Sequence, residues 1–309
     1  MTKHIAVVGS ANVDLIMKMD RLPRVGESVT DADFRQMFGG KGANQAYAAA
    51  LAGRTHPPTR VAFVSCVGDD AYGAQVIDNM RAAGADVAHV FVEPGVATGT
   101  ALIMIGEHGR NYISVAPGAN YRLTPAHVER AAAVIDAADL LVLQYEVPVE
   151  TGLAAARRAR AAGIPVMLNL APPRPISDEF LALLDFFVVN ETEATFVLGF
   201  DVDTDDNVRR AAAALLQRGA RNVIITLGEK GAFVATSDGA AALVPSFPVA
   251  AVDTTAAGDT FCGAFAVALL EGRPPLDAAR FANAAAAITV TRLGAQAAVP
   301  TRDEIEALL

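Results

Sequence analysis

Short runs of apolar, largely β-branched residues alternate along this chain with Ala-rich segments of helical periodicity. Strands that are apolar throughout are covered on both faces, and strands separated by helices form parallel sheets. The alternation therefore predicts an α/β fold, doubly wound, with a mainly parallel sheet sandwiched by helices. Strands are expected at 4–9, 60–68, 140–144, 166–170, 186–190 and 222–228. Helices are expected at about 43–53, 71–83, 125–137, 150–162, 206–218 and 258–271, with a short last helix after Thr301, which has capping-box spacing to Glu304.

Two segments, 12–40 and 96–120, break this alternation. Both are predicted to form short strands, the second as a hairpin that turns at 107–110. We expect them to build a small β-sheet lid that projects from the main layer, within a single domain spanning 1–309. A flat lid exposes an apolar face, and pairing two lids would hide it. The sequence therefore predicts a homodimer through the lid.

Charge and cysteine usage restrict the class of partner. The net charge is −9, which argues against nucleic acid or an anionic membrane surface as the main partner. No apolar run approaches the roughly 18 residues of a membrane span, and the first residues enter a strand pattern that is unlike a signal peptide. Cys66 and Cys262 lie in apolar surroundings, as free thiols do in a reducing compartment. A cytoplasmic protein is expected.

Polar and acidic residues follow several of the predicted strands. In an open α/β sheet, ligands bind outside the carboxyl ends of the strands. Any one such residue is typical of caps and turns, but together they predict a site along one sheet edge. These residues include Asn12, Asp14, Glu146, Asn190, Glu193 and Glu229.

The glycine-rich turn at 39–44 has the sequence GGKGAN. It is not a P-loop, because Gly42 rather than Ser or Thr follows Lys41, and Gln45 breaks the dinucleotide fingerprint. Successive glycines let a backbone approach a ligand closely. Lys41 adds a cation and Asn44 a forked donor and acceptor, which suits a polyhydroxyl ligand. A flexible turn into a helix is the alternative.

The stretch DTTAAGDTF at 253–261 opens a predicted helix. Ala256, Ala257 and Gly258 would leave the backbone N–H groups of the first turn open to an anion, which the helix dipole favours. Asp259, in the same turn, is placed to accept a proton from a hydroxyl. The stretch therefore predicts phosphoryl transfer to an alcohol. Alternatively, Asp259 is an acid that only balances the helix dipole.

These motifs resemble those of the ribokinase-like carbohydrate kinases over nearly the whole chain. The resemblance implies ATP-dependent phosphorylation of D-ribose at O5, with Asp259 as the base and the N–H groups of 256–258 as the anion hole. The matching motifs are GSANVD (9–14), FGGKGAN (38–44), VGDDAYG (67–73), PGAN (117–120), NETE (190–193), TLGEKG (226–231), DTTAAGDTF (253–261) and VTRLGAQ (290–296).

The resemblance also implies three sets of binding residues. The sugar would be held by Asn12, Asp14, Gly40, Lys41, Asn44, Glu146 and Asp259. ATP would lie against Asn190, Thr226, Gly228, Glu229, Gly231, Gly258 and Asn283. Mg²⁺ would be bound through water by Glu193, and K⁺, mostly through carbonyls, by Asp253, Thr255, Thr289, Arg292, Gly294 and Ala298.

Two positions depart from the family pattern. Asn283 stands where a His is common beside the adenine, and Ala298 stands where a Ser is common. Other functions also stay open: a kinase of the same fold for 2-deoxyribose, fructose or adenosine, or a catalytically idle sugar-binding sensor.

Overall fold

The structure of the chain, a computed structural model, describes residues 2–55, 57–107 and 111–309. Its main element is a nine-stranded sheet of order β13-β12-β11-β10-β9-β8-β1-β4-β5. Seven strands run parallel and the last two in the chain form an antiparallel edge. The strands are β1 (Lys3–Val8), β4 (Thr59–Gly68), β5 (Asp86–Glu93), β8 (Leu140–Gln144), β9 (Val166–Asn169), β10 (Phe186–Asn190), β11 (Asn222–Thr226), β12 (Gly231–Thr236) and β13 (Ala241–Pro245).

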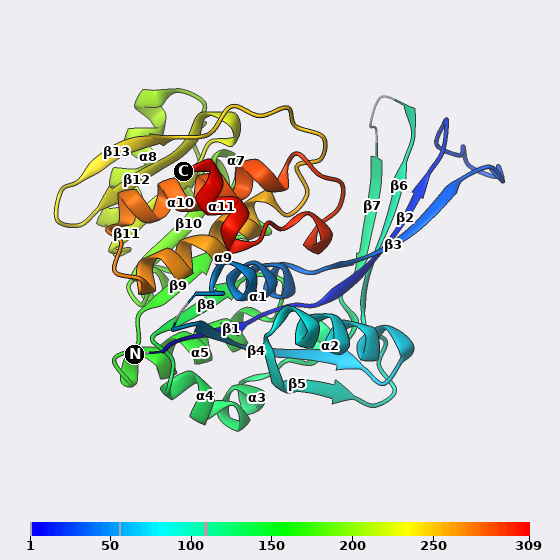
Figure 1. The fold of residues 1–309 in the computed structure, drawn as a ribbon, viewed down its shortest axis with the longest axis horizontal. Coiled ribbons are helices and arrows are strands. Elements are labelled where there is room, and N and C mark those ends of the chain that lie inside the picture. Colours follow the sequence, from blue (N-terminus) through cyan, green and yellow to red (C-terminus); the bar gives the residue numbers. More distant parts are fainter. Residues whose placement is uncertain (1, 56, 108–110) are drawn as a thin grey trace.

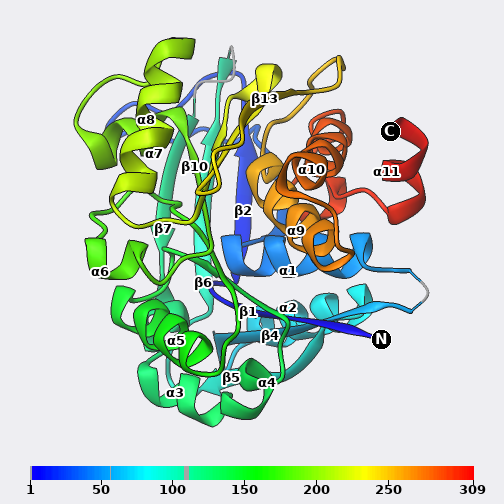
Figure 2. The same ribbon diagram turned by 90° about the vertical axis from the view of Figure 1, so that its left-hand side faces the viewer.

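Helices cover both faces of this sheet, as Figure 2 shows, so the predicted doubly wound α/β fold is confirmed. Alternate residues of β1 enter the two cores: Ile5 and Val7 on one face, Ala6 and Val8 on the other. The first face packs against α1 (Lys41–Ala52), α2 (Ala71–Ala83), α9 (Ala257–Leu270), α10 (Pro275–Thr289) and α11 (Arg302–Leu308). The second face packs against α3 (Pro125–Arg130), α4 (Ala132–Asp136), α5 (Val149–Ala161), α6 (Asp178–Leu181), α7 (Glu191–Leu198) and α8 (Asp205–Gln217).

A second, four-stranded sheet of order β3-β2-β6-β7 projects from the main body (Figure 1). The segments that break the sequence alternation therefore form strands, as predicted. Most of the hairpin turn predicted at 107–110 lies outside the described residues. The strands of this sheet, called the lid below, are β2 (Asn12–Lys18), β3 (Asp33–Gly39), β6 (Gly99–Ile105) and β7 (Asn111–Ala116).

One helix prediction needs correction, and three helices were not predicted. The helix expected at 125–137 is divided into α3 and α4, because the Ala131 backbone (φ −93°, ψ 10°) leaves the helical region and its N–H is shared between two preceding carbonyls. The unpredicted helices are the short α6 and α7 and the longer α10. Seven of the 15 residues of α10 are Ala. Asp277 and Arg280 near its start are exposed, but no residue from Phe281 onward is, so no polar face marks the period of the whole helix in the sequence.

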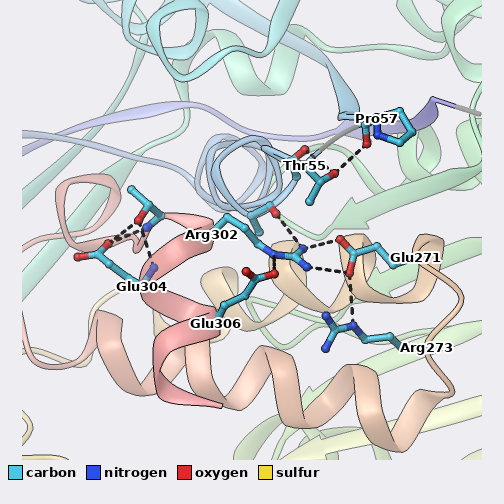
Figure 3. Close-up of polar contacts among 10 residues, drawn as sticks. Thr55, Pro57, Glu271, Arg273, Arg302, Glu304 and Glu306 are labelled. Carbon is cyan, nitrogen blue, oxygen red and sulfur yellow. Dashed lines mark hydrogen bonds and ion pairs between the residues drawn. The ribbon is translucent and has the colours of Figure 1, made fainter.

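Besides Arg292, which pairs with Glu304, the C-terminal helix α11 is held by the guanidinium of Arg302 (Figure 3). Its Nε donates to Glu306 Oε1 (2.6 Å), its Nη2 donates to Glu271 Oε2 (3.2 Å), and its Nη1 donates to the Ala52 carbonyl (3.3 Å). Its charged plane also lies 4.8 Å from the ring centre of Phe281. One side chain thus ties α11 to α1, α9 and α10. Within the described residues, no helix is long and apolar enough to cross a membrane.

Candidate active site

The glycine turn at the start of α1 packs directly against the end of β1. Gly40 has a positive φ of 85°, and a Cβ there would lie 2.6 Å from the Asn12 nitrogen. A Cβ on Gly42 would lie 2.5 Å from the Ser10 nitrogen. Only glycine permits this approach. The turn is therefore a close-packed element, and the alternative of a loose connection does not hold.

The Glu146 carboxylate holds this glycine turn in place. Its Oε2 accepts hydrogen bonds from Ser10 Oγ (2.7 Å) and from the Lys41 backbone N–H (3.0 Å). The carboxylate therefore joins the loop after β8 to the start of α1. Glu146 was predicted as a sugar ligand. Because its carboxylate contacts the Lys41 backbone, it lies at the same edge of the sheet as this other predicted sugar ligand.

Asn12 and Asp14 lie on β2, where the lid meets the main sheet. Asn12 Oδ1 accepts from Asn120 Nδ2 (2.7 Å), and the Asp14 carboxylate lies over Gly39, where a Cβ would come within 2.3 Å of Oδ2. Burial, together with the charges of Glu146 and Asp259, raises the pKa of Asp14 to about 6. These acidic groups thus face a common space.

Helix α9 begins with an uncapped first turn. Its N-cap residue, Ala256, has a left-handed backbone (φ 59°) and a methyl side chain that cannot accept a hydrogen bond. A Cβ added to Gly258 would meet no atom within 4 Å, so the space in front of the turn is open. The Ala257 N–H lies 3.3 Å from the Thr254 carbonyl that accepts it, and N–H groups that stay free at a helix start attract anions. The geometry fits the predicted anion hole.

Asp259, in the first turn of α9, is only 6 % exposed. Its Oδ2 accepts from Asn44 Nδ2 (3.0 Å) and its Oδ1 accepts from Gln45 Nε2 (3.1 Å). The charge of Asp259 is the main cause that raises the pKa of Lys41, against the effect of burial, and Glu146 and Glu193 add to it. Asp259, an acidic residue in the first turn of α9, therefore also binds two side chains of α1.

Two adjoining cavities open on this helix start. The larger is about 800 Å³ and mostly apolar, while the smaller is about 190 Å³ and mostly polar. They share the first turn of α9, so a ligand with an apolar body and an anionic end would span them. The smaller is lined by Lys41, Asn169, Ala171, Val188, Asn190, Glu193, Thr226, Thr254, Ala256, Ala257, Gly258 and Asp259.

The predicted nucleotide residues divide between the two cavities. Asn190 lines the polar one, and the others line the apolar one. Asn283 donates through Nδ2 to the carbonyls of Val244 (2.9 Å) and Pro245 (3.2 Å), so its amide holds the wall of the larger cavity. The predicted residues on the larger cavity are Thr226, Gly228, Glu229, Gly231, Gly258 and Asn283.

Glu193 lies at the start of α7, in the polar cavity. Its Oε2 accepts from the Asn190 N–H (2.8 Å), and Asn190 Oδ1 accepts from the Glu193 N–H (2.8 Å). Burial raises the pKa of this carboxyl group. One carboxylate oxygen remains for a metal-bound water, which fits the role expected for Glu193.

The residues predicted to bind K⁺ lie on two segments that meet just before α9. Asp253 Oδ2 accepts from the Gly294 N–H (2.9 Å), and Asp253 Oδ1 accepts from Thr255 Oγ1 (2.6 Å). The Arg292 guanidinium pairs with Glu304, so only its carbonyl is available for a cation. Thr289 Oγ1 donates to the Ala285 carbonyl (3.0 Å), and Ala298 lies buried in a short 3₁₀ turn (Gln296–Ala298).

Four amide side chains near Asp259 are not among the predicted site residues: Gln45, Gln144, Asn169 and Gln296. All four are almost fully buried. A signal was present for two of them, because Gln144 and Asn169 are the last residues of apolar strands. The other two approach from helical segments, where no local pattern distinguishes them.

Away from this edge, Cys66, Glu93 and His127 bring potential metal ligands within 4.8 Å of one another. However, His127 Nδ1 accepts the Thr124 backbone N–H (3.2 Å), so Nε2 keeps the proton and donates it to Glu93 Oε1 (3.1 Å). Burial raises the pKa of the Cys66 thiol to about 12. His127 and Glu93 therefore form a hydrogen-bonded pair, and the Cys66 thiol beside them is unreactive.

Comparisons with known proteins agree with this geometry. Residues 2–302 match the family described as pfkB family carbohydrate kinase. The chain belongs to this family. It is 40 % identical to a ribokinase of Haemophilus influenzae, over 98 % of this chain and 97 % of that protein. A deoxyribokinase of Salmonella typhi is 38 % identical over 99 % of this chain and 98 % of that protein.

The fold of this pfkB family member is shared by solved structures. An Arabidopsis thaliana ribokinase, in a complex with ribose and ATP, superposes with a TM-score of 0.93. It is 32 % identical, with 100 % of this chain and 99 % of that chain covered. A Thermotoga maritima ribokinase superposes with a TM-score of 0.89 at 38 % identity, covering 100 % and 99 % of the two chains.

Proposed function

We propose that this protein phosphorylates D-ribose at O5 with ATP and releases D-ribose 5-phosphate and ADP. The observation that carries the proposal is the meeting of Lys41, Asp259 and the open start of α9 in one polar cavity. A cation, a carboxylate and free backbone N–H groups are the parts that phosphoryl transfer to an alcohol requires. The similarity to the ribokinases of Haemophilus influenzae and Arabidopsis thaliana supports ribose as the acceptor.

In this proposal the sugar lies between the lid and the start of α1. Asn12 and Asp14 reach it from β2, while Gly40, Lys41, Asn44 and Glu146 approach it from the glycine turn and its support. Asp259 accepts the proton of the O5 hydroxyl as that oxygen attacks the γ-phosphorus of ATP. The N–H groups of 256–258 receive the charge that develops on the phosphoryl oxygens.

ATP occupies the adjoining cavity in this proposal. The adenosine fits the larger, apolar part, and the phosphates reach the polar part along the first turn of α9. Mg²⁺ neutralises phosphate charge when it is bound. Glu193 would hold it through water, because this buried carboxylate has one oxygen free of the capping box.

We further propose that K⁺ binds beside the anion hole, to the carbonyls and side chains that precede α9 and follow α10. The contacts of Asp253 with Thr255 and Gly294 support this, because they join the two segments that would supply ligands. A cation there would stiffen the loop that sets the left-handed residue Ala256. The expected consequence is a higher rate in K⁺ than in Na⁺.

The lid supports a homodimer. On β7, Ile113 is 59 % exposed and Val115 is 53 % exposed, and Tyr112 on the opposite face is 59 % exposed. Alternating side chains point to opposite faces, so both faces of this sheet are apolar. One face can close over sugar, and we propose that the other pairs with the lid of a second copy. A monomeric mass by light scattering would contradict this part of the proposal.

The main alternative within the family is 2-deoxyribose, which the similarity to the Salmonella typhi deoxyribokinase favours. The proposed location, the cytoplasm, suits the two buried free thiols of Cys66 and Cys262. One domain spanning 1–309 is proposed to perform the whole reaction.

The test is ADP release by the purified protein with Mg-ATP and D-ribose, 2-deoxyribose, fructose or adenosine, each in K⁺ and in Na⁺. We expect the highest kcat/KM with ribose and a higher rate in K⁺. A preference for another acceptor would overturn the choice of sugar and keep the kinase chemistry. A folded protein that binds ribose and releases no ADP would instead be a sensor.

A further inference from the structure

Two chains of buried amide side chains end on the two carboxylate oxygens of Asp259. The last links are adjacent residues of α1. Asn44 donates to Oδ2 and Gln45 donates to Oδ1, at 3.0 and 3.1 Å. Each oxygen of the proposed base thus has its own donor.

The first chain starts at the end of β8. Gln144 Nε2 donates to Gln45 Oε1 (2.8 Å), and Gln45 Nε2 donates both to Asp259 and to Asn169 Oδ1 (3.1 Å). Asn169 Nδ2 in turn donates to the Val188 carbonyl (3.2 Å). Both N–H groups and the oxygen of Gln45 are therefore engaged, which leaves its side chain a single orientation.

Close packing holds the start of this chain. A Cβ on Gly9 would lie 1.9 Å from Gln144 Oε1, so only glycine leaves room for that amide. On the other side, a Cβ on Gly263 of α9 would lie 2.5 Å from the Gln45 carbonyl. Helix α9, which carries Asp259, thus lies against the backbone that carries Gln45.

The second chain starts on α2. Asn79 Nδ2 donates to Gln296 Oε1 (2.6 Å), and Gln296 Nε2 donates to Asn44 Oδ1 (3.1 Å). Asn44 then donates to Asp259. This chain links a helix near the lid to the proposed base through three amides.

Both chains run in one direction. From Gln144 to Gln45, and from Asn79 through Gln296 to Asn44, each amide nitrogen donates to the next amide oxygen, and the last nitrogen donates to Asp259. Asn169 is a side branch, because it accepts from Gln45 and donates to the Val188 carbonyl. Gln144 Oε1 has no hydrogen-bond partner among the described residues. The ionised carboxylate can only accept, so it fixes the orientation of every amide behind it. Hydrogen bonds arranged head to tail polarise one another, and donors on a carboxylate favour its charged form.

We propose that Gln45 and Gln296 are positioning residues for Asp259. Gln45 acts directly on Oδ1, and Gln296 acts on Oδ2 through Asn44. Together they hold the carboxylate in one orientation, facing the space in which the proposed function places the sugar hydroxyl. This inference rests on the proposed function, in which Asp259 is the base.

The test is the pH profile of kcat with ribose and Mg-ATP for Gln45→Met and Gln296→Met. Both replacements keep the side-chain volume and remove the amide. We expect kcat to fall about 10- to 100-fold in Gln45→Met and less in Gln296→Met, with KM for ATP changed less than about threefold. The acid limb of the profile should move up by about one pH unit, because the carboxylate loses a donor.

Gln45→Glu separates positioning from packing. It is nearly isosteric, but it places a carboxylate oxygen against Asp259, so the acid limb should move further than in Gln45→Met. Asn222→Leu is the control, because Asn222 Nδ2 bonds the Asp185 carbonyl (2.7 Å) at the opposite end of β11. It should leave the profile unchanged.

If Gln45 variants do not fold, Asn79→Ala tests the second chain from its partly exposed start. An acid limb that stays at the wild-type pH in Gln45→Met, Gln296→Met and Asn79→Ala overturns the inference. The Asp259→Asn variant distinguishes a failure of this inference from a failure of the proposed function. If Asp259→Asn keeps wild-type kcat, Asp259 is not the base and the proposed function fails with it.

Discussion

Helices α7 and α9 both begin at the polar cavity, yet their first turns are built in opposite ways. The first turn of α7 is closed by a reciprocal capping box between Asn190 and Glu193. The first turn of α9 has Ala256 at its N-cap and no acceptor for its N–H groups among the described side chains. A capped helix start stabilises the protein without a ligand. An uncapped start leaves backbone N–H groups available to a ligand.

Backbone strain sharpens this difference. Ala256 is the one non-glycine residue with a positive φ among those that the structure describes. Such a conformation costs about 1–2 kcal/mol. Asn190, in contrast, has an ordinary extended backbone. Strain that persists at a cavity indicates a functional constraint. The first turn of α9 therefore lowers the stability of the fold, whereas the first turn of α7 raises it.

The largest expected effect comes from closing the open helix start with a charge. Gly258→Asp would place a carboxylate in the open space before the first turn of α9. We expect a gain of about 0.5–1 kcal/mol in stability from the helix dipole and helix propensity. Turnover should fall about 10³-fold, because the new charge repels the phosphates.

Thermal unfolding and ADP release, measured on the same samples, test both signs. Gly258→Ala is the matched control, since its added Cβ meets no atom within 4 Å and brings no charge. A Gly258→Asp variant that keeps its turnover would show that no anion binds at this helix start.

The start of helix α11 provides a third comparison, because this helix start has only a structural role. Its capping box and the Arg302 contacts lie away from both cavities. Arg302→Ala would remove a guanidinium that is only 9 % exposed and leave Glu271 paired with Arg273 alone. We expect a loss of about 2–3 kcal/mol from the lost hydrogen bonds of a charged group and the lost packing on Phe281, with unchanged kcat below the melting transition. A large fall in kcat of the folded variant would contradict this separation of stability from activity.

The carboxylates of the site repeat the contrast. Asp259 receives two amide donors, whereas Asp14 receives none from the described residues and its pKa rises to about 6. The folded state binds this proton more tightly than the unfolded chain does. The ionised group therefore costs stability at pH 7, and the cost diminishes as the pH falls through 6 toward 4.

Asp14→Asn should thus raise stability by about 2 kcal/mol at pH 7.5 and by about half of that at pH 5. It should also raise KM for the sugar. Denaturant unfolding at the two pH values measures the first effect. An equal gain at both values would mean that the ionisation of Asp14 costs nothing in the fold.

Much of this site follows from local sequence. The open start of α9 is evident because Ala, Ala and Gly precede Asp259, and the glycine turn is evident because Gly40 and Gly42 flank Lys41. Both are short-range signals. The parallel sheet follows likewise from its uninterrupted apolar strands.

What could not be predicted depends on contacts between distant segments. Gln45 reaches Asp259 across 214 positions, and Gln296 reaches Asn44 across 252. No local pattern distinguishes such an amide from one that simply faces solvent. Helix α10 escaped prediction for a different reason, since no residue from Phe281 onward is exposed and no polar stripe runs along the whole helix.

The smallest effects compare the two helix starts directly. Asn190→Ala removes the side-chain cap of α7, and we expect a loss of about 1 kcal/mol. Ala256→Gly relieves the left-handed strain at α9, partly offset by the greater freedom of glycine in the unfolded chain, for a net gain of about 0.5 kcal/mol. Denaturant unfolding of both variants gives the two values.

Opposite signs would establish that α7 is optimised for stability and α9 is not. Equal signs would contradict this view, because the two first turns would then contribute to folding in the same way. The loop before α9 must also hold Ala256 in place for the anion hole to form. Ala256→Gly should therefore lower kcat by a few-fold while it stabilises the fold, because a glycine there samples other backbone conformations.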